Sequence, residues 1–124
     1  MSRADRRRAE RRGRFAETLA SLWLQLKGYR LLAKRVRTPV GEFDLALQRG
    51  RTLAIVEVKA RPSATDGLQA VTDLAKRRIC AAAETWASAQ PALTDLDLRF
   101  DLVIITPRSP PIHLRGAWRP DDPV

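Results

Sequence analysis

Residues 41–60 read GEFDLALQRGRTLAIVEVKA and decide the fold, because two short apolar runs lie on either side of one turn-like segment. Side chains alternate between the two faces of a strand, so Glu57 and Lys59 project together while the valines beside them face the other way. Gly50 can supply the positive φ of a tight hairpin turn. The stretch therefore predicts a β-hairpin with one apolar face and one face that carries ionisable groups.

The register of this hairpin depends on its turn. A two-residue loop at Gly50 and Arg51 pairs residue 47 with residue 54 and places Asp44 directly opposite Glu57, with β-carbons roughly 5 Å apart. A loop centred one residue earlier leaves the two acids diagonal on the same face, and a bulged three-residue loop disrupts the arrangement. The sequence thus predicts a close pair of carboxylates, with the first register as the hypothesis.

Two carboxylates at this separation repel each other unless a cation lies between them or one keeps its proton. Mg²⁺ binds one or two protein carboxylates and keeps waters that can be activated toward a phosphodiester. The main-chain carbonyl of Val58 could complete the ligand set. Lys59 could hold the attacking water or stabilise charge on the phosphate. The pattern is therefore typical of a metal-dependent nuclease site.

An ordinary solvent-facing strand with alternating charge is the alternative interpretation of residues 56–59. The neighbouring residues decide between the two. Leu53 and Ile55 share the face of Glu57, so the charged end continues a surface that is otherwise apolar, and Asp44 belongs to the matching strand. These two observations favour the site.

The spacing of Asp44, Glu57 and Lys59 resembles the PD-(D/E)xK, or restriction-endonuclease-like, superfamily, whose active site is an Asp followed by (Asp/Glu)-x-Lys. More closely, residues 13–117 resemble the bacterial YraN family, of UPF0102 type, which is related in fold to archaeal Holliday-junction resolvases. The strict Pro-Asp pair is absent, and Glu42-Phe43 precedes the Asp instead. The matching positions are Gly13-Arg14, Glu17, Gly28-Tyr29, Arg37, residues 41–45, residues 56–61, Lys76 and residues 99–101.

The resemblance implies that Asp44 and Glu57 are metal ligands and that Lys59 is the catalytic lysine, and the Val58 carbonyl is the further ligand expected from the coordination argument above. The cofactor is then Mg²⁺ or Mn²⁺. The resemblance also makes Glu17 a fourth participant from the first helix. Glu42 is either an outer ligand of the ion or a charge at the rim.

The charge of the chain is concentrated at its start. The net charge is +9, and residues 1–14 contribute +5 of it through seven Arg against Asp5 and Glu10. We expect a basic arm that contacts nucleic acid, and five phosphates contacted on a duplex would give a log–log salt slope of roughly −4 to −5. A solubilising tail is the alternative, and an anionic membrane surface is a weaker one. The expected contacts in the arm are Arg6, Arg7, Arg8, Arg11, Arg12 and Arg14.

Further nucleic-acid contacts are expected at Arg37 and Arg61, which match family positions. In the superfamily, the helix after the lysine strand often carries polar groups near the site, which implies contacts from Gln69 and Lys76. A solvated helix face is the commoner meaning of such residues.

The hydrophobic periodicity predicts an α/β fold: a restriction-endonuclease-like αβββαβ core with a mixed central sheet flanked by helices. The first helix spans about residues 12–27, with an apolar stripe against the sheet and Glu17 nearly opposite that stripe, which favours solvent exposure of Glu17. The stripe is Phe15, Leu19, Leu22 and Leu26. The other elements are strands at 29–37, 99–105 and, at an edge, 112–118, and a helix that begins near residue 66 and ends before Pro91.

Length and composition indicate one folded domain at residues 14–118, preceded by the basic arm at 1–13 and followed by a loose tail at 119–124. The lone Cys80 cannot form an internal disulfide and indicates a reducing cytoplasm. The most apolar helical stretch is too short to cross a membrane, so none is expected as a partner. Asp101 is interpreted as structural, and His113 as a bystander rather than a base.

Three functions are compatible with these features. The first is a Mg²⁺- or Mn²⁺-dependent nuclease acting on DNA, including branched structures. The second is a non-catalytic nucleic-acid-binding module on the same fold, and the third an interaction protein with a vestigial acidic pocket. Two carboxylates facing a polyanion favour the first, because they would oppose binding alone. The resolvase comparison suggests a homodimer, and the choice between DNA and RNA stays open.

Overall fold

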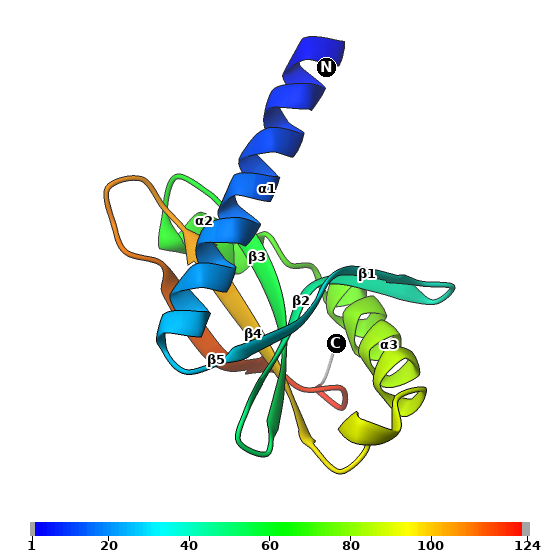
Figure 1. Cartoon of the computed structure of the whole chain (residues 1–124). Coiled ribbons are helices and arrows are strands. Elements are labelled where there is room, and N and C mark those ends of the chain that lie inside the picture. Colours follow the sequence, from blue (N-terminus) through cyan, green and yellow to red (C-terminus); the bar gives the residue numbers. More distant parts are fainter. Residues whose placement is uncertain (1, 123–124) are drawn as a thin grey trace.

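Residues 2–122 are described in the computed structural model, in which one sheet lies between helices on its two faces (Figure 1). The sheet order is β1-β2-β3-β4-β5. The elements are α1 (Arg3–Leu26), β1 (Arg30–Thr38), β2 (Gly41–Arg49), β3 (Thr52–Ala60), α2 (Ala64–Gln69), α3 (Asp73–Ser88), a 3₁₀ turn η1 (Pro91–Leu93), β4 (Asp97–Ile105) and β5 (Ile112–Trp118).

The sheet is mixed, as predicted. Strands β1, β2 and β3 form an antiparallel meander, β4 returns parallel to β3 after the helical crossover, and β5 is an antiparallel edge strand. The pairing of Leu47 with Ala54 and of Arg49 with Thr52 confirms the two-residue turn at Gly50 and Arg51. Gly50 has a φ of 59°, which is the left-handed conformation that this turn requires.

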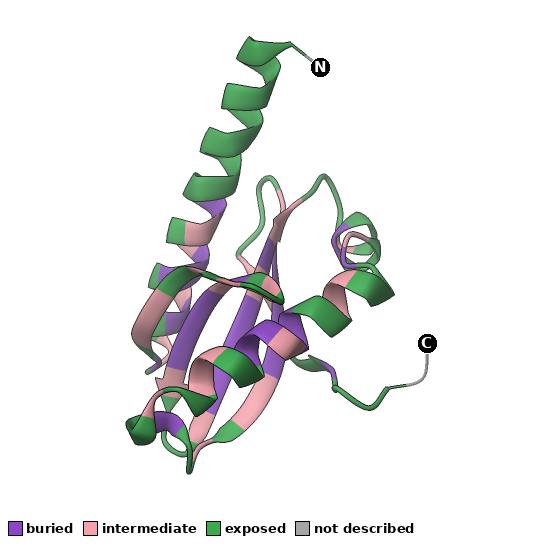
Figure 2. Ribbon diagram, turned by 90° about the vertical axis from the view of Figure 1, so that its right-hand side faces the viewer, coloured by how far each residue is buried: buried purple, intermediate pink, exposed green. Residues whose placement is uncertain are grey.

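An apolar layer lies on each face of the sheet, between the strands and the helices that cover that face. The central parts of the strands, between the two layers, are buried (Figure 2). On one face, Ile79 of α3 and Leu53 and Ile55 of β3 belong to the same apolar cluster. On the other face, α1 packs against Val56 and Val58. The predicted alternation of β3 is therefore confirmed, because Glu57 continues the face that α3 covers.

Helix α1 differs from the prediction in its start and in its buried face. It begins at Arg3, where the Ser2 side chain accepts from the Asp5 N–H, so the arm forms the first turns of the helix and projects beyond the sheet (Figures 1 and 2). The predicted stripe lies outside: Phe15, Leu22 and Leu26 are 66%, 54% and 84% exposed.

The residues that α1 buries are Ala16, Ala20, Ser21 and Leu24. Ala16, Ala20 and Leu24 recur every four residues, so they also form one helical face. The small side chains of Ala16 and Ala20 let the helix axis approach the sheet closely. The prediction was wrong because two stripes of this helix have helical periodicity, and side-chain size decides which one fits against the strands.

The helical crossover is also divided differently from the prediction of one helix beginning near residue 66. Helix α2 ends at Gln69, and α3 starts again after Thr72, whose hydroxyl accepts from the Ala75 N–H. A Thr side chain that caps three residues on favours a new helix start over a continuous helix. In one continuous helix, the spacing of Leu68 and Val71 would place both on the buried face, but in this structure Leu68 is exposed.

Asp101 is fully buried between β4 and β5, and its carboxylate is satisfied by four hydrogen bonds. Arg99 donates to both oxygens at 2.8 Å, His113 Nε2 is 2.8 Å from Oδ2, and the Gly116 N–H donates to Oδ1 at 3.0 Å. Burial would raise the pKa of Asp101, but the hydrogen bonds from His113 and Arg99 hold it below its usual value. The structural interpretation of Asp101 fits this geometry.

The ring of His113 is engaged on both sides, because Lys27 Nζ lies 2.8 Å from Nδ1. An ammonium can only donate, so Nδ1 accepts from Lys27. Nε2 therefore carries the ring proton and donates a hydrogen bond to Asp101. The imidazole is 3% exposed and is held by hydrogen bonds within this network, which agrees with the bystander interpretation.

Within residues 2–122, no helix combines the length and the apolar character needed to cross a membrane.

Candidate active site

Asp44 and Glu57 meet where the pairing of β2 and β3 ends. The last paired residues are Leu45 and Val56, so Asp44 and Glu57 are the next positions in the same register. The Val58 backbone N–H donates to Asp44 Oδ2 at 2.8 Å, a bond that takes the place of a main-chain partner at the end of the ladder. The predicted pairing of the two carboxylates is therefore present.

The strand changes its faces at this point. Phe43 contacts the α3 layer, with its ring 5.5 Å from that of Trp86, while Leu45 and Leu47 belong to the α1 layer. Regular alternation would place all three on one face. Asp44 lies at this break, so groups from both helical layers can approach its carboxylate.

The Glu57 carboxyl has a strongly perturbed pKa. Burial and the adjacent Asp44 carboxylate raise its pKa to about 9, with Lys59 opposing the change and Glu17 adding to it. Without a cation between them, the pair therefore shares a proton at neutral pH. A divalent ion would replace that proton, and its charge would offset both the repulsion between the carboxylates and the cost of burying their charge.

A hollow of about 340 Å³ opens beside the pair, between the sheet and the first turns of α3. Asp44, Glu57 and Lys59 line one wall, and Arg78 brings a second cation from the helix. Gly41 holds α3 at this distance, because a Cβ there would lie 2.5 Å from the Arg78 carbonyl oxygen. With Glu42 at its rim, the hollow thus combines three carboxylates and two cations in one open cavity.

Glu17 reaches the same corner from the opposite layer. Its carboxylate lines a smaller hollow with Asp44 and accepts from Arg35 Nε at 3.1 and 3.3 Å. Arg35 has a φ of 48°, an unfavourable left-handed conformation for a residue with a side chain. The solvent-exposed alternative is wrong, because the Glu17 side chain is only 17% exposed.

The donor set fits a hard divalent cation. Carboxylate oxygens are the ligands Mg²⁺ and Mn²⁺ prefer, and Mg²⁺ typically uses one or two of them and keeps several waters. Among residues 2–122, no three His, Cys, Asp or Glu side chains are grouped closely enough to hold an ion by themselves. Asp44 and Glu57 would therefore hold it together with waters and the Val58 carbonyl. Glu17, already bound by Arg35, is at most an outer partner.

The expected nucleic-acid contacts fall into separate places. Arg6, Arg7, Arg8 and Arg11 lie on the exposed, projecting half of α1 (Figure 2). Arg12 and Arg61 line a groove beside α1, and Arg14 lines a hollow beside Glu17. Arg37 lies 3.6 Å from Glu42 at the exposed rim of the site. Gln69 is exposed at the end of α2, apart from the carboxylates.

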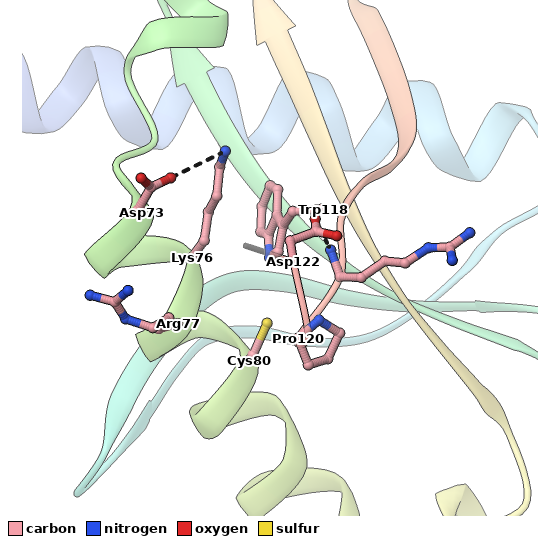
Figure 3. Close-up of a pocket in the computed structure, with 8 residues that line it drawn as sticks. Asp73, Lys76, Arg77, Cys80, Trp118, Pro120 and Asp122 are labelled. Atoms are coloured by element: carbon pink, nitrogen blue, oxygen red, sulfur yellow. Dashed lines mark hydrogen bonds and ion pairs between the residues drawn. The ribbon is translucent and has the colours of Figure 1, made fainter. Parts of the chain in front are cut away.

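Lys76 points to the other flank of α3. It lines a second hollow, of about 280 Å³, with Cys80, Trp118 and residues of the C-terminal segment, and its ammonium lies 4.0 Å from Asp73 (Figure 3). The structure therefore separates Lys76 from the carboxylate pair.

Burial raises the pKa of the Cys80 thiol in this second hollow, which makes the thiol a poor nucleophile.

Two participants of the site could not be anticipated from the sequence. Arg78 reaches the hollow only because α3 packs beside Gly41, and Arg35 reaches Glu17 only through its left-handed backbone. The three consecutive cations of α3, residues 76–78, give a weak signal for the first. No pattern marks the second.

The mixed sheet flanked by helices, with Asp44 on β2 and Glu57 and Lys59 on β3, is consistent with a restriction-endonuclease-like core. The chain belongs to the uncharacterised protein family UPF0102, whose model matches residues 16–105. A UPF0102 protein of Chelativorans sp. (strain BNC1) is 50% identical over 117 residues, 94% of this chain and 94% of that protein.

Two further relatives carry the same description. The one from Parvibaculum lavamentivorans is 52% identical over 112 residues, 90% of this chain and 84% of its own length. The one from Maricaulis maris is 48% identical over 122 residues, 98% of this chain and 95% of its own. The family match includes Glu17, Asp44, Glu57 and Lys59, whereas the arginines of the projecting half of α1 precede it.

Proposed function

We propose that this protein is a Mg²⁺- or Mn²⁺-dependent nuclease that hydrolyses phosphodiester bonds in DNA, including branched structures. One observation carries the proposal: Asp44 and Glu57 are held side by side in a hollow where burial and mutual repulsion raise the pKa of Glu57 to about 9. Such a pair costs stability in the metal-free protein and opposes a polyanion. A bound divalent cation would neutralise the two carboxylates, which accounts for their placement side by side.

The roles of the residues follow from their charges. Asp44 and Glu57 would hold the ion, which supplies Lewis-acid activation of water and of the phosphoryl group. Lys59 is placed to orient the attacking water or to stabilise the charge that develops on the phosphate. Arg78 is placed to bind a phosphate oxygen at the α3 wall of the hollow.

A binding module without turnover is the second candidate, and the projecting half of α1 favours it. This half presents arginines to solvent well away from the carboxylate pair, as a phosphate-contacting element would. We expect the same helix to hold substrate for the nuclease, so the two candidates differ only in whether the hollow is catalytic. The buried free thiol of Cys80 fits the reducing cytoplasm as the compartment for either.

The deciding experiment incubates labelled single-stranded, duplex and four-way-junction DNA with the purified protein and Mg²⁺, Mn²⁺ or chelator. Glu57→Ala and Lys59→Ala test the site, and Glu84→Gln, at an exposed acid of α3 that does not line the hollow, is the matched control for loss of an acid. We expect cutting that requires metal, is lost in both site variants and is kept in the control.

Binding of the ion is measured separately by the rise in melting temperature on adding Mn²⁺. We expect a rise for wild type and none for Glu57→Ala. Equal DNA binding by all variants, with no cutting and no response to metal, would favour the binding module over the nuclease.

A further inference from the structure

An apolar groove runs beside α1, along the ends of β3 and β4. Its volume is about 820 Å³, within the usual range of sites that bind ligands. Phe15 stands in its wall and is 66% exposed, so an aromatic ring is offered to whatever enters. The other main apolar residues of the wall are Leu19, Ala60, Pro62, Ile105 and Pro107.

The charges of the groove have one sign. Arg12 comes from the α1 side, Lys59 and Arg61 come from the end of β3, and none of the residues lining the groove is acidic. The groove therefore complements a chain molecule that carries negative charges along its backbone and apolar groups beside them. A second copy of this chain is a poor match, because the exposed half of α1 is itself basic.

The groove and the candidate active site lie on opposite faces of the sheet and share one lining residue at the end of β3. Lys59 lines both the groove and the hollow that contains Asp44 and Glu57. A chain lying in the groove would thus bring its backbone to the lysine proposed to act on a phosphate. The shared lysine favours a nucleic acid over a lipid, because a nucleic acid repeats its phosphates along the chain and can occupy the groove while a phosphate contacts Lys59.

We infer that the groove binds single-stranded nucleic acid, with a base against Phe15 and phosphates at Arg12, Lys59 and Arg61. The inference rests on the proposed function and names its substrate class. Unpaired bases stack on aromatic side chains while a cationic groove follows the backbone. A duplex keeps its bases stacked inside and cannot fill an apolar groove. The site is therefore suited to a single-stranded segment of an unusual or branched DNA.

The test measures the affinity of the full chain for fluorescent oligothymidylate, for an abasic strand of equal length and for a duplex, by fluorescence anisotropy in the presence of chelator. Wild type is expected to prefer oligothymidylate to the abasic strand. Phe15→Ala should weaken oligothymidylate binding about five- to a hundredfold and leave the abasic strand unaffected. Phe15→Trp should preserve the preference.

Leu26→Ala is the matched control, because it removes an exposed apolar side chain from the same helix outside the groove. It should change neither affinity. Equal wild-type affinity for oligothymidylate and the abasic strand, or no effect of Phe15→Ala, would overturn the inference while leaving the nuclease proposal standing. Loss of binding to vesicles of phosphatidylglycerol in Phe15→Ala, with oligothymidylate binding unchanged, would assign the groove to lipid. Failure of wild type to bind any of the three nucleic acids would overturn both proposals.

Discussion

Replacing Glu57 by Gln should stabilise the metal-free protein, with a benefit that grows with pH. The pKa of this carboxyl rises from 4.5 to about 9 on folding, chiefly through burial and the neighbouring Asp44. Between these values the folded state holds a proton that the unfolded state releases. The contribution of this protonation to the free energy of unfolding is therefore fully present below pH 4.5 and is lost as the pH rises toward 9. A Gln side chain does not titrate, and its amide can donate to Asp44 in place of the proton.

The size of the effect follows from the same pKa. Each pH unit above 4.5 costs wild type about 1.4 kcal/mol, so the penalty that Gln removes is about 3 kcal/mol near pH 7. For a domain of this size, that free energy corresponds to a rise in melting temperature of about 10 °C. Near pH 4.5 the two proteins should melt at almost the same temperature.

The assay is thermal unfolding of both proteins in chelator, followed by circular dichroism from pH 5 to pH 8. Glu42→Gln is the control, because it removes an equal charge from a side chain that is 73% exposed and should change the melting temperature little at any pH. A Glu57→Gln protein that melts at or below wild type throughout this range would refute the argument, because the carboxyl would then be charged and well accommodated.

Three other changes probe the fold and the basic helix. Gly41→Ala should destabilise the protein by about 1–3 kcal/mol in urea unfolding, because its Cβ would lie 2.5 Å from the Arg78 carbonyl oxygen; an unchanged midpoint would show that α3 can move away. Asp101→Asn should cost about 3–5 kcal/mol in the same assay, because it removes the charge that pairs with Arg99 and places an amide NH₂ where both carboxylate oxygens accept; a loss below about 1 kcal/mol would contradict the importance of the network. A triple Ala variant of the projecting helix should reduce the log–log salt slope for duplex binding by about 3, and an unchanged slope would exclude phosphate contacts there. The arginines replaced are Arg6, Arg7 and Arg11.

The hairpin could be predicted from the sequence because its determinants are local. Gly50 allows only a few turn geometries, and the two-residue loop fixes Asp44 opposite Glu57. Alternation along β3 then places Glu57 under α3 and Val58 under α1. The carboxylate pair, which is the centre of the candidate site, follows from these short-range rules alone.

The parts that could not be predicted depend on packing between distant elements. Periodicity in α1 is compatible with two buried faces, and only contact with the sheet selects Ala16 and Ala20 over Phe15. Once that face is known, Glu17 must point toward the site. The ion pair of Glu17 with Arg35 depends in addition on a left-handed residue that carries a side chain, for which sequence patterns give no indication.

The network around Asp101 has a consequence for how the chain folds as it leaves the ribosome. Its acceptor lies in β4, but His113 and Gly116, which supply two of its donors, are translated later, in β5. Until they emerge, burying Asp101 would leave its carboxylate short of hydrogen bonds, which is costly in an apolar interior. The hairpin of residues 41–60 is translated much earlier, yet the favourable burial of Asp101 between β4 and β5 waits until residues 113–116 have been made.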